Sequence, residues 1–147
     1  MKFATIEPIK KRLRVAEFRD LHSAVRSVGV DPHATDHGVV QRNHRGPNFS
    51  IVVYEFGLFT PVADQHYFAT GGRLYAGNAV LYGFNEIGET VDVVEPLPDV
   101  TFFADAPAVE LAIAARVIPR PRMSANGMVI WEWPNPAPVH MQRHMRS

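Results

Sequence analysis

Histidine is the residue type with the most evident capacity for chemistry in this sequence, since it occurs seven times in 147 residues. His33 and His37 stand four residues apart, a spacing that on a helix would turn two imidazoles toward one metal ion. Three further side chains that can bind a metal lie nearby in the sequence: Asp31, Asp36 and His44. Pro32 and Gly38 argue against a helix in this segment. We therefore interpret it as a polar surface loop and expect no metal site.

The middle of the chain offers a second kind of chemistry, because aromatic rings gather there beside polar groups. The rings belong to Tyr54, Phe56, Phe59, His66, Tyr67, Phe68, Tyr75 and Tyr82, and the polar side chains include Glu55, Gln65, Asn78 and Glu86. Aromatic walls with a few polar groups suit a planar ligand such as a nucleobase, through stacking and hydrogen bonds to its edge. Alternating aromatic residues also build the core of a half-buried sheet, and this is the interpretation we favour.

No sequence motif names a reaction. The chain has no glycine-rich phosphate loop, no Gly-x-Ser-x-Gly elbow, no His-Glu-x-x-His and no calcium loop. It also has no cysteine, which excludes disulfides, thiolate nucleophiles and cysteine-bound zinc or iron–sulfur clusters. We expect neither a cofactor nor a metal, and we favour binding over catalysis.

Hydrophobic periodicity predicts the elements that would position these side chains. Apolar runs predict strands at 2–6, 12–18, 49–56, 66–70, 73–76, 79–84, 89–94, 101–104 and 128–133. An apolar stripe at helical spacing predicts a helix at 21–28, capped by Asp20 and ended by Gly29, and a second helix is predicted at 106–118. Residues 31–48 are expected to be loop apart from a short strand at 39–41.

Two turn signals predict how the strands pair. Gly71-Gly72 and Asn85-Glu86-Ile87-Gly88 each join two predicted strands in a hairpin, so neighbouring strands run antiparallel. These hairpins and the two helices favour an α+β fold, with a mostly antiparallel sheet and two helices packed on one face in a two-layer sandwich. Residues 1–133 are expected to form this single domain, and residues 134–147 a Pro-rich, basic and flexible tail.

Three segments of the chain resemble a class of small proteins of unknown function that phages and mobile elements encode. Residues 1–8 (MKFATIEP) are similar to its first Met-Lys strand ending in Glu-Pro, and residues 77–89 (GNAVLYGFNEIGE) to its Gly-rich hairpin. Between them, residues 54–57 (YEFG) look like its acidic-x-Gly turn. The resemblance covers about residues 1–95. It implies an accessory protein of a virus or plasmid, and it implies no catalytic residues.

Charge is distributed unevenly along the chain although the formal net charge is zero. Residues 1–47 hold nine Lys and Arg against five Asp and Glu, residues 48–110 hold one against nine, and residues 111–147 hold five against one. Such a distribution can produce a two-sided surface that attracts a charged partner. Alternatively the basic ends fold back onto the acidic middle and neutralise it, which is the interpretation we favour.

The basic run at residues 10–14 (KKRLR) is the strongest cationic feature. Four cations there could contact phosphates. The aromatic region is acidic, however, so base stacking and phosphate binding would not coincide as they do in proteins that bind single strands. We interpret the run as a solvated turn between strands and regard nucleic acid as an unlikely partner.

Composition and hydropathy indicate the compartment. With 46% hydrophobic and 20% charged residues the chain has the composition of a globular protein. Residues 1–8 lack the apolar run of a signal peptide, and no stretch approaches the ~18 apolar residues of a membrane span. We expect a cytoplasmic protein with no membrane partner.

Two hypotheses for function follow. The first is a non-enzymatic accessory binding protein, viral or plasmid-encoded, that binds a host protein or a small nucleotide-like ligand and can form a homo-oligomer. Its candidate binding residues are Tyr54, His66, Tyr67, Asn78, Glu86, Trp131 and Trp133. The second is a small enzyme with a pocket in the central aromatic region, formed by His66, Tyr67, Asn78, Glu86 and Glu89, in which His or Glu acts as general acid or base. The missing catalytic motifs favour the first.

Overall fold

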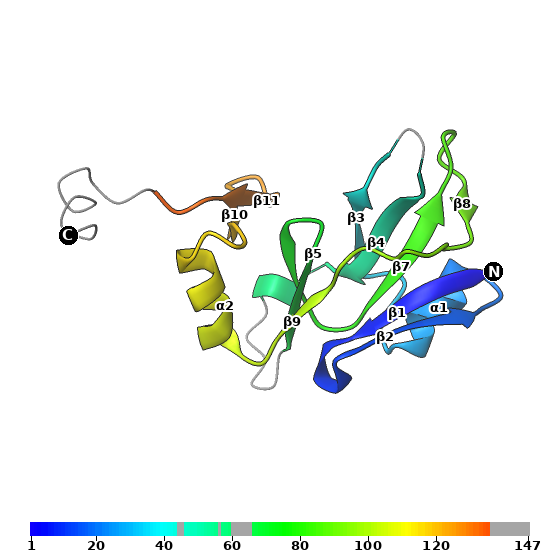
Figure 1. Cartoon of the computed structure of the whole chain (residues 1–147), viewed down its shortest axis with the longest axis horizontal. Coiled ribbons are helices and arrows are strands. Elements are labelled where there is room, and N and C mark those ends of the chain that lie inside the picture. The colour runs from blue at the N-terminus through cyan, green and yellow to red at the C-terminus, as the bar shows by residue number, and fades with distance from the viewer. Residues whose placement is uncertain (44–45, 56, 60–65, 136–147) are drawn as a thin grey trace.

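The computed structural model describes residues 1–43, 46–55, 57–59 and 66–135, and this part of the chain contains two α-helices and eleven strands in antiparallel sheets (Figure 1). The largest sheet, sheet A, has the strand order β2 (Arg12–Glu17), β1 (Lys2–Glu7), β7 (Ala79–Phe84), β4 (Asn48–Tyr54), β3 (Thr35–Gln41). The short β8 (Thr90–Val91) pairs with the end of β7. The predicted α+β class with mostly antiparallel sheet is confirmed.

Two smaller sheets and the helices complete the described elements. Sheet B consists of β6 (Arg73–Ala76), β5 (Tyr67–Thr70) and β9 (Thr101–Phe103), and sheet C is the hairpin of β10 (Arg120–Met123) and β11 (Val129–Glu132). The α-helices are α1 (Leu21–Ser27) and α2 (Ala106–Ala114), and short 3-10 turns span Pro8–Lys10 and Gly57–Phe59. No helix in the described ranges has the length and apolarity that a membrane crossing requires.

Three buried clusters arrange these elements in the order α1, sheet A, sheet B, α2. The first joins α1 to sheet A through Phe3, Ala24, Val25, Val52 and Val80. The second joins the opposite face of sheet A to sheet B and includes Ile6, Phe49, Ile51, Phe68, Tyr75 and Leu81. The third joins the outer face of sheet B to α2 and includes Ala69, Leu74, Val109 and Ile113.

This layering differs from the expected two-layer sandwich with both helices on one face. Helix α1 covers sheet A and helix α2 covers sheet B, at opposite ends of the molecule (Figure 1). The reason is that sheet A is apolar on both faces, so one layer of helices cannot bury it. Strand periodicity then orients sheet B, because Phe68 faces sheet A while its neighbour Ala69 faces α2.

The predicted turns and caps form as the sequence indicates. Gly71 and Gly72 join β5 to β6 with φ angles of +58° and +76°, which glycine adopts at little cost. The Asp20 carboxylate accepts a hydrogen bond of 2.8 Å from the backbone N–H of Ser23 and so caps α1. Asp105 caps α2 in the same way, at 2.9 Å from the N–H of Ala108.

Two strands were not predicted in full. Strand β3 begins at Thr35, where the sequence predicted loop, and pairs with β4 through a bulge between Val39 and Gln41. Strand β10 contains Pro121, which pairs with Trp131. Each of these strands lies at the edge of its sheet, where polar residues and proline are tolerated because one side of the strand needs no backbone partner.

The first testable prediction concerns the layer between the two larger sheets. Replacing Leu81, which is 0% exposed, by alanine should lower the free energy of unfolding by about 2–5 kcal/mol, because a cavity opens in the core. The control is Leu111→Ala on the outer side of α2, where leucine is 73% exposed and the change should stay within about 0.5 kcal/mol. Urea denaturation measures both; equal effects would contradict the proposed layering.

Candidate functional site

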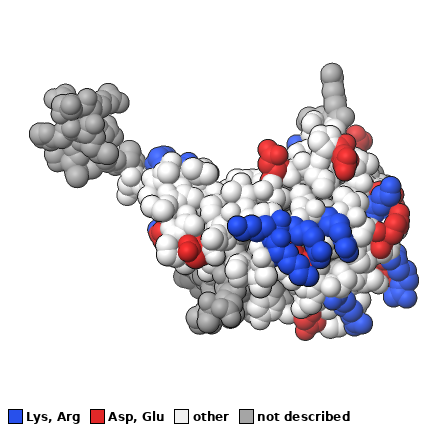
Figure 2. Space-filling model, turned by 60° about the horizontal axis from the view of Figure 1, so that its bottom comes forward, with Lys and Arg blue, Asp and Glu red and all other residues white. Residues whose placement is uncertain are grey.

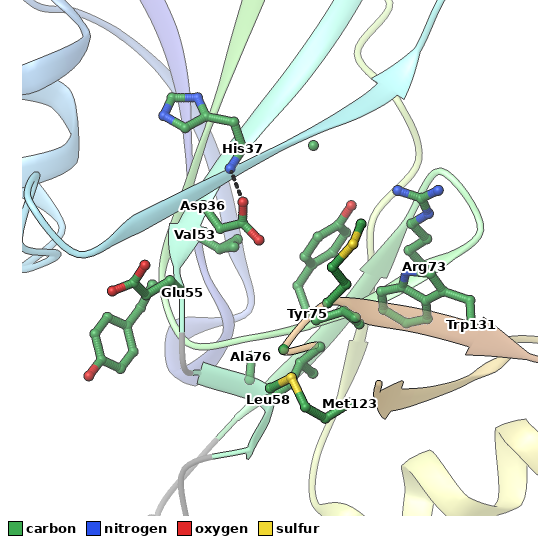
Figure 3. Close-up of a pocket in the computed structure, with 15 residues that line it drawn as sticks. Asp36, His37, Val53, Glu55, Leu58, Arg73, Tyr75, Ala76, Met123 and Trp131 are labelled. Atoms are coloured by element: carbon green, nitrogen blue, oxygen red, sulfur yellow. Dashed lines mark hydrogen bonds between the residues drawn. The ribbon is translucent and has the colours of Figure 1, made fainter. Parts of the chain in front are cut away.

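A hollow of about 450 Å³ lies where the edge of sheet A meets sheet B and the β10–β11 hairpin (Figure 3). Its volume falls within the ~300–1,000 Å³ range of small-molecule sites. We call it the aromatic groove. The side chains that give it chemical character are Asp36, Tyr54, Glu55, Arg73, Tyr75 and Trp131.

Trp131 and Tyr75 form the aromatic side of this groove. Their ring centroids are 6.4 Å apart at an interplanar angle of 59°. The guanidinium carbon of Arg73 lies 5.8 Å from the centroid of the Trp131 ring, within the distance of a cation–π interaction. Tyr75 in turn stacks on the buried Phe68 at 5.4 Å. The aromatic wall is therefore anchored directly on the core.

The Tyr75 hydroxyl is the polar group of this wall. Tyr75 is buried, and Figure 3 shows it between Asp36 on β3 and the Arg73–Trp131 pair. Burial raises the pKa of its hydroxyl above the ordinary value, the charge of Arg73 and a hydrogen bond with Arg73 oppose that rise, and the Asp36 carboxylate adds to it. The hydroxyl is protonated at neutral pH, as a tyrosine of ordinary pKa also is, and can donate a hydrogen bond.

Strand β3 separates the groove from a different polar contact. Asp36 belongs to the groove side, whereas the imidazole of its neighbour His37 points away from Tyr75 (Figure 3). Nδ1 of His37 lies 3.0 Å from the hydroxyl of Tyr82, which packs against the cluster under α1. The next residue, Gly38, borders Tyr75, since a Cβ there would lie 3.4 Å from the Tyr75 hydroxyl oxygen, at ordinary van der Waals distance.

Of the seven predicted binding residues, Tyr54 and Trp131 line the aromatic groove. Trp133 is 50% exposed and follows β11, where its ring lies 5.8 Å from the guanidinium carbon of Arg116. Trp131 is half-buried and already contacts Arg73 and Tyr75. The two tryptophans therefore differ in role, since Trp131 docks the hairpin against sheet B while Trp133 presents a ring to solvent.

Two other predicted residues stabilise the turns beside β5 and β6. The backbone carbonyl of His66 accepts a hydrogen bond of 2.9 Å from the N–H of Gly77. The Asn78 side chain donates to the backbone carbonyl of Val28 at 3.0 Å and ties the β6–β7 turn to the end of α1. This hydrogen bond gives the polar side chain of Asn78 a structural role.

The remaining residues of the expected enzyme pocket lie elsewhere. Tyr67 lines a separate hollow of about 190 Å³ beside α2. Glu86 is exposed in the β7–β8 turn, and Glu89 accepts a hydrogen bond there from Asn85 at 3.1 Å. The structure places His66, Tyr67, Asn78, Glu86 and Glu89 on different strands and turns, and the expected enzyme pocket stays a prediction.

The histidine-rich segment forms part of a strand and not the loop we expected. His37 lies in β3, and the His33 ring contacts the ring of His22 at 6.3 Å. Among the described residues no three His, Cys, Asp or Glu side chains are placed to hold a metal ion. His44, Phe56, Gln65, the side chain of Phe59 and residues 136–147 of the expected tail lie outside the described part of the chain.

Sequence reasoning did not assign Asp36 and Arg73 to the groove. Asp36 was grouped with the histidines, because strand β3 was not predicted at that position. A signal for Arg73 was present, since it is the one Lys or Arg in residues 48–110. A lone cation inside an acidic and aromatic stretch indicates a specific partner, and here that partner is the pair Tyr75 and Trp131.

Comparisons of this chain with protein-family models, with curated proteins and with solved structures found no match. The chemistry of the groove is therefore argued from its own residues.

The groove yields a prediction for the pH dependence of stability. The folded-state pKa of Tyr75 is raised, so the corresponding stabilisation is fully present below the unfolded tyrosine pKa of about 10 and is lost as the pH rises through the folded pKa. Ultraviolet titration should show one tyrosine ionising after the others, and this last step should be missing in Tyr75→Phe. The unfolding free energy of the variant should fall less steeply in alkali; an unchanged last step would assign it to another tyrosine.

Proposed function

We propose that this protein is a non-enzymatic binding protein whose aromatic groove holds a small, planar, nucleotide-like ligand. The observation that carries the proposal is the buried Tyr75, which lies in an aromatic wall between a carboxylate and a guanidinium. A pocket of mostly apolar lining with a few converging polar groups is the usual form of a small-molecule site.

The three polar groups suit the edge of a heterocycle. The Asp36 carboxylate only accepts hydrogen bonds, the Arg73 guanidinium only donates them, and the Tyr75 hydroxyl does either. A nucleobase carries ring and exocyclic N–H donors beside carbonyl or ring-nitrogen acceptors, which is the complementary pattern. Stacking against the aromatic wall would supply the non-directional part of the affinity.

The charge of the groove narrows the ligand further. Asp36 and Glu55 both line it, and Arg73 is the one Lys or Arg among its lining residues. Two carboxylates near a triphosphate would oppose its binding by like-charge repulsion. The groove therefore favours a base, a nucleoside or a nucleoside monophosphate over a nucleotide with several phosphates.

Two methionines give the groove an adaptable side. Met128 is 62% exposed and Met123 is 39% exposed, and both line the hollow from the β10–β11 hairpin. Thioether side chains are unbranched and polarisable, so they adjust to ligands of different outline and contact aromatic rings favourably. This arrangement favours a groove that binds several related planar ligands over one that selects a single ligand.

The accessory role belongs to the same proposal and rests on the resemblance of residues 1–95 to proteins of phages and mobile elements. A small protein of this kind acts by binding and withholding a ligand, without turning it over. Native mass spectrometry of the purified protein, followed by denaturation and small-molecule analysis, tests whether it carries such a ligand from cells. A bound host protein in place of a small molecule would overturn the ligand assignment.

A titration tests the groove itself. In a Trp133→Phe background Trp131 is the sole tryptophan, so its fluorescence reports on the groove. Guanosine, adenosine, cytidine and uridine and their monophosphates serve as probes. At least one should change the Trp131 emission saturably, and Asp36→Asn should weaken that binding about tenfold or more, because a hydrogen bond to a charged group contributes roughly 1.5–3 kcal/mol.

The matched control is Glu86→Gln, which removes a carboxylate from the exposed β7–β8 turn and should leave the affinity unchanged. Circular dichroism verifies that both variants keep the fold. Equal weakening by the two variants, or no saturable response to any of the eight probes, would contradict the proposed site.

A further inference from the structure

The turn between β1 and β2 carries a group of cations at the outer edge of sheet A. We call Lys10, Lys11, Arg12 and Arg14 the basic hairpin. Strand β2 is the edge strand of the sheet, and its register places Arg12 opposite Glu7 and Arg14 opposite Thr5. Figure 2 shows Lys and Arg side chains gathered on one face of the molecule with little acidic surface among them.

These cations are only partly compensated within the described chain. Glu7 binds both Lys10, at 3.2 Å, and Arg12, at 2.5 Å. Lys11 and Arg14 are exposed and form no salt bridge with any described residue. The basic hairpin therefore presents four cations against one carboxylate.

The expected neutralisation of the basic ends by the acidic middle is not what the described salt bridges show. None of them joins residues 1–47 to residues 48–110, and Arg120 with Glu110 is the pair that links the C-terminal segment to the middle. Arg120 and Arg122 on β10 have the same spacing as Arg12 and Arg14, yet each binds its own carboxylate, on Glu110 and Glu132. Of these two hairpins, the β1–β2 hairpin is therefore the one that leaves cations without a carboxylate partner among the described residues.

The backbone at Lys11 provides a second, independent observation. Lys11 adopts a left-handed conformation with φ of +48°, and its N–H donates to the carbonyl of Pro8 at 3.0 Å. Glycine or asparagine adopts this conformation with less strain than lysine. A lysine at the tip of this turn therefore carries a small backbone cost, which binding by its ammonium group would offset.

We propose that the basic hairpin binds the phosphate backbone of a nucleic-acid strand without reading its sequence. This function is separate from the ligand of the aromatic groove. Alternate residues of an extended strand lie about 6.8 Å apart, which is close to the distance between consecutive phosphates of an extended nucleic-acid chain. Arg14, which forms no salt bridge with any described residue, can thus bind one phosphate in a bidentate pair, whereas Arg12 would have to exchange its contact with Glu7 for the neighbouring phosphate.

The arrangement fits a polyanionic strand better than a lipid surface. The exposed Ile9 precedes the cations at the tip of the turn, but Arg12 and Arg14 continue back along β2 and do not surround it. A line of cations follows one strand, whereas insertion into a bilayer needs a wider apolar face. No exposed aromatic ring belongs to the basic hairpin, so base stacking does not contribute there.

Fluorescence anisotropy with labelled single-stranded and duplex oligonucleotides of mixed sequence tests this inference on the full chain. The Kd for the single strand should lie between about 10⁻⁴ and 10⁻⁶ M near physiological salt and should weaken steeply between about 50 and 200 mM NaCl. Lys11→Glu combined with Arg14→Glu should weaken binding at least tenfold at low salt. Loss of two phosphate contacts should reduce the slope of log K against log salt by about 1.4 for a single strand.

The matched control is Arg120→Glu with Arg122→Glu, which changes the net charge equally and should leave binding within about twofold because those arginines are already paired. Lys11→Gly is a second variant that relaxes the turn while it removes one cation, so it should be at least as stable as the parent and still bind less tightly. Asp36→Asn should bind the oligonucleotide as the parent does, which separates this surface from the groove.

Three outcomes would overturn the inference. One is an equal loss of oligonucleotide affinity in the Lys11/Arg14 and Arg120/Arg122 variants, which would show that binding depends on net charge alone. Another is a protein that binds no oligonucleotide but does bind vesicles of phosphatidylcholine with about one quarter phosphatidylserine. The third is a parent protein that binds no oligonucleotide while the Lys11/Arg14 variant self-associates in sedimentation velocity, because the cations would then only protect the edge strand from pairing.

Discussion

The rest of the structure depends on one constraint, the burial of β7 on both faces. Ala79, Val80 and Leu81 are fully buried in succession, and they alternate between the cluster beneath α1 and the cluster beneath sheet B. A strand that is apolar on both faces must be covered twice, or it would expose an aggregation-prone surface. The seven-residue α1 supplies one cover, and three-stranded sheet B supplies the other. Sheet B then has an outer apolar face of its own, which α2 buries.

The aromatic groove is a consequence of this layering. Sheet B has fewer strands than sheet A, so it covers the central strands and leaves the β3 edge to be closed by another element. The β10–β11 hairpin closes it incompletely, held by the contacts of Trp131 with Arg73 and Tyr75. A hollow between two sheets is lined by side chains from strands that are far apart in the sequence. The core beneath it fixes the position of Tyr75.

Local signals made much of the fold predictable, and their absence explains what was missed. The Gly71-Gly72 turn and the apolar run of β4 each act through neighbouring residues, so the sequence predicted them correctly. The first part of β3, residues 35–38, was missed because its polar side chains show no alternation, and its pairing with β4 is a long-range property. The groove was predicted in part, through Tyr54 and Trp131. Asp36 and Arg73 could not be joined to them, because no spacing rule relates residues on three separate strands.

The opposite edges of sheet A impose different electrostatics on any ligand. Strand β3 at one edge contributes Asp36 to an aromatic, acidic groove, whereas at the other edge Arg14 on β2 and Lys11 in the turn before it form no salt bridge with any described residue. A protein that binds single strands through their bases needs aromatic rings and cations side by side. Here the sheet separates them, so the same nucleotide cannot stack in the groove and place its phosphate on the basic hairpin. We therefore propose two separate ligands, a free base or nucleoside in the groove and a strand held by its phosphates on the basic hairpin.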